Sequence, residues 1–204
     1  MQLEHDSAFL MHSPFASMPE FLQCVVKAFA AGAPRHHRLV FKAHPLESGR
    51  RALARDIAAL AAQYDIADRV DYVPGGKLAQ LLDHALSAVT VNSTAGQQAL
   101  WRGLPLKAFG KAVYDKPQFV SSLPLEEFFA QPPYPDNAAY LDYRRYLLET
   151  SQLPGGFYST RGRRQLLRQV IDMLLSDLDP FDAFEYGNSA SLSGRENTKS
   201  REVD

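Results

Sequence analysis

Apolar positions in the first half of the chain alternate between two patterns, one typical of short strands and the other typical of helices. Short apolar or β-branched runs predict strands at residues 8–12, 38–42, 69–73, 87–91 and 104–109. Between them, apolar residues recur three and four positions apart, which is the spacing of a helix with one buried face. These segments predict helices at residues 17–29, 50–64, 78–85 and 95–102.

Strands that alternate with helices at this spacing indicate βαβ units and a parallel sheet covered on both faces. Because such units cross over in a right-handed sense, the pattern predicts a Rossmann-like, doubly wound α/β fold. Ser17 and Glu20 stand three positions apart, which is the spacing of a capping box that opens a helix.

The chain changes character after Tyr114. A proline-rich connector at residues 131–135 precedes two expected helices, at residues 137–150 and 161–175. From Gly187 onward the residues are polar, small or charged, and they offer too little apolar surface to become ordered. We therefore predict a Rossmann-like domain with C-terminal helices at residues 1–186, followed by a disordered tail at residues 187–204.

Composition narrows the class of protein. A hydrophobic fraction of 46% is ordinary for a globular protein, and a net charge of -1 gives no reason to expect a nucleic-acid binder, which usually shows a basic face. No stretch reaches the ~20 apolar residues that span a bilayer, and the first residues do not resemble a signal peptide. The single cysteine, Cys24, fits a reducing compartment. We expect a cytoplasmic protein, associated at most peripherally with the inner face of the inner membrane.

The segment from Asn92 to Gly96 is the most suggestive of ligand binding, because a predicted strand ends there and a helix begins. Ligands of open α/β sheets bind outside the carboxyl ends of the strands. Free N–H groups at a helix start favour an anion, and the hydroxyls of Ser93 and Thr94 can donate to a phosphate. Thr94 and Gln97 also have capping-box spacing, and spacing alone favours Thr94 as a helix cap. The two roles are compatible.

A histidine–proline pair, His44-Pro45, follows the second predicted strand. Pro45 holds the preceding residue in an extended conformation, which aims the His44 side chain off the strand end. A histidine at this place is a candidate donor of a hydrogen bond to a phosphate. Lys42 lies two positions earlier, so it would share the same face of the strand and add positive charge. For an isolated pair, a histidine bonded to a loop carbonyl is the more common arrangement.

Three further residues are candidates to line the same cleft. His12 and Ser13 follow the first predicted strand, and Asp115 follows the fifth, although Ser13 and Asp115 also suit ordinary turns. The sequence has no zinc-ligand spacing, no glycine-rich dinucleotide or phosphate loop, and no nucleophile elbow. We therefore expect no metal and no cofactor, and the catalytic group stays unassigned.

Five clusters, taken in order, resemble the capsule polysaccharide biosynthesis and export proteins of the KpsS, KpsC and LipB kind. These are Gln2-Leu3-x-His5-Asp6-Ser7, His12-Ser13-Pro14-Phe15, Phe41-Lys42-x-His44-Pro45, Val91-Asn92-Ser93-Thr94-x-Gly96 and Gly110-x-x-x-Tyr114-Asp115. A histidine–proline pair alone is weak evidence, but five clusters in this order and at these separations are specific. The resemblance covers residues 1–160, nearly all of the chain that we expect to be ordered.

The resemblance implies a GT-B glycosyltransferase that moves β-Kdo from CMP-Kdo onto a lipid-linked acceptor or a growing Kdo linker. This chain would be the C-terminal, donor-binding half, with His44, Ser93 and Thr94 at the CMP phosphate and Lys42 and Asn92 nearby. A GT-B enzyme needs two Rossmann-like domains, and the resemblance places the start of this chain near the start of the second. The acceptor domain and its catalytic base would then be missing. Our hypothesis is a truncated product, a gene fragment, or a split subunit that needs a separate acceptor-domain chain.

Two other interpretations stay open. A UDP-sugar transferase of the same architecture would prefer UDP over CMP. A non-catalytic accessory protein of capsule polysaccharide assembly or export would use the same fold for protein contacts. It would bind no nucleotide, and replacing His44 would leave its function unchanged.

Overall fold

The computed structural model describes residues 1–153, 155 and 159–185. The chain divides into two compact units, with the boundary between Tyr140 and Leu141. The first unit contains both sheets and every candidate site residue. The tail at residues 187–204 lies outside the described residues, so its predicted disorder stays a prediction.

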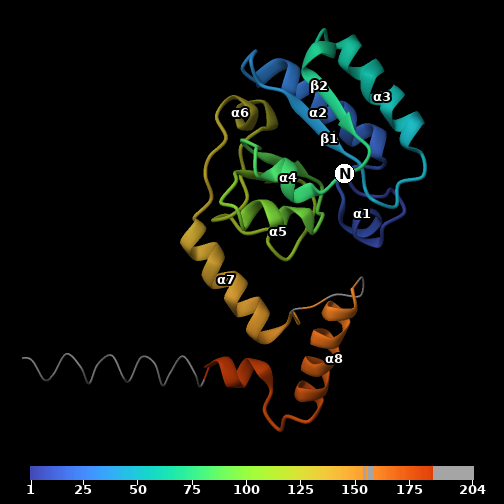
Figure 1. Ribbon diagram of the computed structural model, residues 1–204. Helices are drawn as coiled ribbons and strands as arrows, with labels where there is room; N and C mark the ends of the chain where they lie inside the picture. The colour runs from blue at the N-terminus through green and yellow to red at the C-terminus, as the bar shows by residue number, and fades with distance from the viewer. Residues whose placement is uncertain (154, 156–158, 186–204) are drawn as a thin grey trace, which may run out of the picture. The chain divides into compact units, whose positions relative to one another are not determined.

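The strands of the first unit form two small parallel sheets (Figure 1). In one, β1 (Leu39–Lys42) pairs with β2 (Val70–Val73), with Leu39 opposite Val70. In the other, β3 (Ala88–Thr90) pairs with β4 (Leu106–Ala108), with Ala88 opposite Leu106. The predicted α/β class with parallel strands is confirmed. The described residues form two two-stranded sheets, however, instead of the single sheet that the pattern predicted.

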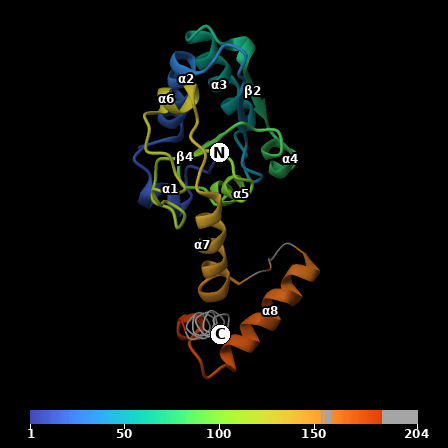
Figure 2. The same ribbon diagram turned by 90° about the vertical axis from the view of Figure 1, so that its left-hand side faces the viewer.

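Helices surround the two sheets (Figures 1 and 2). They are α1 (Ser7–His12), α2 (Met18–Gly32), α3 (Arg50–Gln63), the 3-10 turn η1 (Ala67–Arg69), α4 (Leu78–Leu82), α5 (Ala95–Leu100) and α6 (Leu125–Ala130). Helix α3 packs against β2, whereas α5 packs against β3 and β4. Helix α2 packs against both α3 and α6. The predicted alternation of strands and helices from residue 38 to residue 109 is therefore confirmed.

Helix α2 supplies much of the hydrophobic core. Its start has the predicted Ser17 cap, whose hydroxyl accepts from the Glu20 N–H, while the Glu20 carboxylate accepts from the N–H of Ala16, one residue before the cap position of a standard capping box. The buried face of the helix includes Phe21, Leu22, Val25, Val26 and Phe29. Each such side chain contributes about 1.5–3 kcal/mol when it is removed from water.

Two segments differ from the sequence-based expectation. Residues 8–12, predicted as a strand, belong to helix α1. Asp6 caps the start of this helix, because its side chain accepts a hydrogen bond from the Ala8 N–H at 2.9 Å. A five-residue apolar run has no period that separates a strand from a helix, so the cap decides the outcome. Helix α6 was not predicted at all. It is short and has no side-chain cap, but its apolar face is buried against α2.

The helices predicted near the C-terminal end are present. Helix α7 (Asn137–Thr150) has the predicted bounds, and α8 (Thr160–Leu174) lies one residue earlier than predicted. Ser159 caps α8 by accepting a hydrogen bond from the Gly162 N–H at 3.0 Å. In the part of the chain that the structure describes, no helix combines the length and the apolar character that a membrane crossing requires.

Candidate functional site

The first two residues join the carboxyl ends of β1 and β3. The Met1 amino group donates to the Lys42 carbonyl at 2.7 Å, and Gln2 exchanges two hydrogen bonds with Asn92, at 2.6 and 3.0 Å. We call this region the carboxyl edge, defined as residues 1–2, 42–45 and 92–96. The two segments singled out from the sequence, after β1 and after β3, are thus brought to one place in the fold.

Asn92 connects the carboxyl edge to the first residues of the chain through its hydrogen bonds. Its side chain is buried, its Oδ1 accepts from Gln2, and its Nδ2 donates to the Ala8 carbonyl at 2.7 Å. Gly110 lies against it so closely that a Cβ there would stand 3.0 Å from the Asn92 amide and 2.5 Å from the His12 carbonyl. These bonds give Asn92 a positioning role. Its expected place beside a phosphate stays a prediction.

Replacing Asn92 with alanine should destabilise the chain markedly. The change removes the acceptor of the Gln2 Nε2 group and the Nδ2 donor to the Ala8 carbonyl, while the bond from the residue 92 backbone N–H to Gln2 remains, and each such loss costs about 1–3 kcal/mol. We expect thermal unfolding to shift down by about 5–10 °C. Thr94→Ala is the matched control, because Thr94 is a nearby, exposed residue whose side chain makes no cap bond. Equal melting temperatures for the two variants would contradict this role.

The helix start at α5 differs from the cap predicted by spacing. Thr94 already has helical backbone angles, and its side chain makes no capping bond. An N-cap residue needs an extended backbone to reach the next N–H groups. Ser93 instead receives the Ala95 N–H on its Oγ at 3.2 Å. The capping interpretation of Thr94 is therefore wrong, and its exposed hydroxyl makes no bond to the helix start.

A buried tyrosine, Tyr114, packs against the turn at residues 93–96 and holds it by a hydrogen bond. Its hydroxyl donates to the Ser93 carbonyl at 2.5 Å, and burial raises the pKa of the phenol far above its ordinary value, so it stays a protonated donor. A Cβ on Gly96 would stand 2.5 Å from the Tyr114 hydroxyl, so glycine lets the ring lie against α5. Both residues belong to the clusters noted in the sequence, but their contact was not predicted.

His44 and Lys42 form the other side of the carboxyl edge. The Nδ1 of His44 accepts from the Leu46 N–H at 3.2 Å, which assigns the ring proton of the neutral imidazole to Nε2. His44 is half-buried, and Nε2–H is its donor for a further partner. The Nζ of Lys42 donates to the Ala43 carbonyl at 2.8 Å. Pro45 is exposed, and its carbonyl accepts from Arg50.

The remaining candidates lie near the segment that follows β4. The His12 carbonyl accepts from the Lys111 N–H at 3.2 Å, and the His12 side chain is exposed. Ser13 makes a turn, with its Oγ accepting from the Phe15 N–H at 2.9 Å. Asp115 is exposed in a turn, where its N–H donates to the Ala112 carbonyl. A cleft-lining role for His12, Ser13 and Asp115 stays a prediction.

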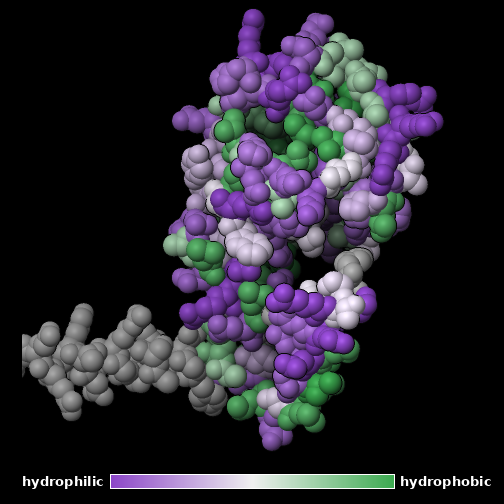
Figure 3. Space-filling view, in the orientation of Figure 1, coloured by the Kyte–Doolittle hydropathy of each residue, from purple (hydrophilic) through white to green (hydrophobic). Residues whose placement is uncertain are grey.

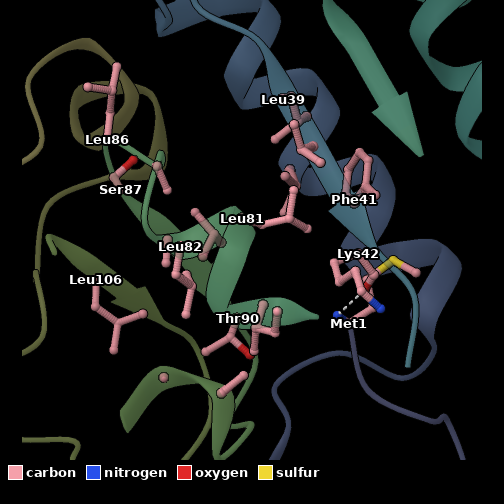
Figure 4. A pocket seen from close by; sticks show the side chains of 18 of the residues that line it. Met1, Leu39, Phe41, Lys42, Leu81, Leu82, Leu86, Ser87, Thr90 and Leu106 are labelled. Atoms are coloured by element: carbon pink, nitrogen blue, oxygen red, sulfur yellow. Dashed lines mark hydrogen bonds between the residues drawn. The ribbon is translucent and has the colours of Figure 1, made fainter. Parts of the chain in front are cut away.

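A cavity of about 740 Å³ separates the two sheets. Figure 3 shows a hollow lined by hydrophobic residues on one face, and Figure 4 shows part of the set of side chains that line the cavity. Most of the lining is apolar and comes from β1, α4, β3 and β4, including Leu39, Phe41, Leu81, Leu82, Val89 and Leu106. Polar lining from the carboxyl edge includes Gln2, Lys42 and Ser93. Local sequence patterns do not predict this cavity, because it arises from the separation of the two sheets.

The family model described as capsule polysaccharide biosynthesis protein matches residues 1–158. The chain is 36% identical over 160 residues to the capsule polysaccharide modification protein LipB of Neisseria meningitidis, from both a serogroup A and a serogroup B strain. It is 33% identical over 158 residues to the capsule polysaccharide export protein KpsS of Escherichia coli. Each match covers 78% of this chain, but only 38% of LipB and 41% of KpsS, so the chain spans about two-fifths of their length. No solved structure matches the chain.

Proposed function

The chain belongs to the family of capsule polysaccharide biosynthesis proteins, and on that premise we propose that it is the donor-binding part of a capsule glycosyltransferase. The proposed donor is CMP-Kdo, and the proposed architecture is one Rossmann-like half of a GT-B enzyme. One observation carries the proposal. The two clusters suited to a phosphate, residues 42–45 and 92–96, share the carboxyl edge, which is where open α/β sheets bind ligands.

The proposed phosphate contacts come from side chains. His44 presents Nε2–H, Thr94 presents an exposed hydroxyl, and Lys42 supplies a positive charge in the same region. Hydrogen bonds to a charged phosphate are about twice as strong as those between neutral groups. Helix α5 has six residues, so we assign the main attraction to these side chains rather than to the helix dipole.

The proposed contribution to the reaction is stabilisation of the leaving group. When the bond between the anomeric carbon and the phosphate oxygen breaks, negative charge grows on the departing CMP. Donors fixed before the reaction then stabilise the transition state more than the ground state. The acceptor hydroxyl, on a lipid-linked or Kdo-linker glycan, would form the new bond and give its proton to a base in an acceptor-binding part of the enzyme. That part would be a further domain or a separate chain of the capsule assembly system.

Calorimetric titration of the chain with CMP and with UDP tests the proposal. We expect CMP to bind with a dissociation constant between about 1 μM and 1 mM, and at least about tenfold more tightly than UDP. A preference for UDP would point instead to a UDP-sugar donor. If a chain that unfolds cooperatively bound neither nucleotide, the proposal would fail, and an accessory role in capsule assembly or export would replace it.

A further inference from the structure

The two sheets face one another across the cavity with their open edges, and the cavity is mostly apolar. We propose that it is the seat of one additional β-strand, a short apolar segment that leads into Met1 from its amino side. This strand would join the two sheets into a single parallel sheet with the order β2, β1, inserted strand, β3, β4. The proposal stands apart from nucleotide binding, because it concerns the backbone edges and not the phosphate contacts.

The backbone of β1 is ready to pair on its cavity side. The Ala43 N–H donates to the Val73 carbonyl, so every second residue, which includes Phe41, turns its N–H and C=O towards β2. Val40 and Lys42 therefore turn theirs the other way. The Lys42 carbonyl confirms this direction, because it accepts a hydrogen bond from Met1.

The backbone of β3 shows the same arrangement from the opposite side. The Ala88 N–H donates to the Pro105 carbonyl, and the Thr90 carbonyl accepts from the Phe109 N–H, so both residues face β4. Val89 lies between them and turns its N–H and C=O away from β4. Within the part of the chain that the structure describes, no strand pairs with the cavity-side edge of β1 or of β3, so a single strand can bond to both.

The position of Met1 and Gln2 sets the direction of the inserted strand. Met1 bonds to the end of β1, and Gln2 bonds to Asn92, just after β3 (Figure 4 shows Met1 beside Lys42). In a parallel ladder, a residue joined to the amino side of Met1 would stand opposite Lys42. A segment that enters Met1 through the cavity would consequently run parallel to all four strands. Because β1 is four residues long and β3 three, the segment needs about four or five residues.

The lining of the cavity suits a central strand. Helix α2 contributes Phe21, Val25 and Phe29, and helix α4 contributes Leu81 and Leu82. Central strands of parallel sheets are covered on both faces and are apolar along their whole length. The polar residues of the lining lie mostly at the two ends of the cavity. At the carboxyl ends of β1 and β3 they are Gln2, Lys42, Thr90 and Ser93, before the amino ends of these strands they are His36, His37, Arg38 and Ser87, and Gln80 and His84 belong to α4 and the turn after it.

The Met1 amino group gives independent support. Burial, together with the nearby charge of Lys42, lowers its pKa from 8.0 to about 6, so the charged form is disfavoured at this position. A peptide N–H in the same place would donate the same bond to the Lys42 carbonyl without carrying a charge. An uncharged N–H donor therefore suits this position better than a charged amino group.

The test is an extension fused to Met1 of the full chain. One variant carries Lys-Lys-Ile-Val-Val-Val-Thr, and the matched control carries Lys-Lys-Ile-Val-Pro-Val-Thr. Proline lacks the N–H that a central strand needs, while the rest of the extension stays the same. We expect the first extension to raise the melting temperature by about 10 °C and the control to leave it unchanged. In the first variant, hydrogen exchange at the Val40 and Val89 amides should slow by about 100-fold.

Several outcomes would overturn the inference. They are equal melting temperatures for the two extensions, unchanged exchange at Val40 and Val89, or a dimer that forms only with the apolar extension, which would assign the cavity to a second copy. An apolar fluorescent dye gives a further readout, since the first extension should expel it and the control should not. CMP titration of the same variants separates this inference from the proposed function, because sheet completion and nucleotide binding are then measured independently.

Discussion

Replacing His44 with alanine is expected to weaken CMP binding by about 10- to 100-fold, which corresponds to the loss of one hydrogen bond to a charged group. The Nδ1 of His44 is held by the Leu46 N–H, so the ring is oriented with its Nε2 donor available to a phosphate. Alanine removes this donor. Because His44 is a half-buried loop residue outside the hydrophobic core, its replacement should cost little stability. We therefore expect the melting temperature to stay within about 2 °C of the original while affinity falls, as measured by calorimetric titration.

The matched control is His36→Ala. His36 is an exposed histidine before the amino end of β1, opposite to the end that His44 follows. Its replacement should leave CMP affinity unchanged within about twofold, since a phosphate at the carboxyl edge is far from it along the strand. If both variants lost affinity equally, or neither did, the assignment of His44 to the phosphate would be wrong.

Replacing Gly32 with alanine should destabilise the fold strongly. Gly32 ends helix α2, and a Cβ there would overlap the backbone of Glu126 in α6. The backbone of a packed helix cannot yield as a flexible side chain does, and overpacking of this kind costs about 3 kcal/mol or more. The gain in helix propensity, about 1 kcal/mol, is too small to offset it. We expect a fall in melting temperature of about 10 °C, measured by circular dichroism.

Gly75→Ala provides the comparison. No atom lies within 4 Å of a Cβ placed on Gly75, and its backbone angle is not in the left-handed region. The same substitution should therefore change the melting temperature by less than about 2 °C. If Gly32→Ala were as stable as Gly75→Ala, the close packing of α2 on α6 would be refuted.

Local signals in the sequence predicted the local structure well. The Ser17 and Glu20 spacing predicted the start of α2 because the cap that Ser17 makes with the Glu20 N–H is complete within four residues. The apolar spacing of residues 50–64 likewise predicted α3. The same signals failed where two local interpretations compete, as at residues 8–12, where the cap supplied by Asp6 makes a helix out of an apolar run.

Non-local features were beyond the reach of the sequence. The gap between the two sheets depends on which strand edges pair, and no local sequence pattern near β1 or β3 specifies this pairing. Part of the carboxyl edge could be anticipated, since polar residues that follow strands in a parallel sheet share one edge. The role of Asn92 could not, because its partners Gln2 and Ala8 lie more than 80 positions away.

A CMP titration, followed through the backbone amide resonances of the isotope-labelled chain, shows directly whether the carboxyl edge holds the donor phosphate. We expect shifts that saturate together at residues 42–46 and 92–96, with residues 36–38 unchanged. Shifts centred at residues 36–38, or no shifts at CMP concentrations above about 1 mM, would contradict this placement of the phosphate.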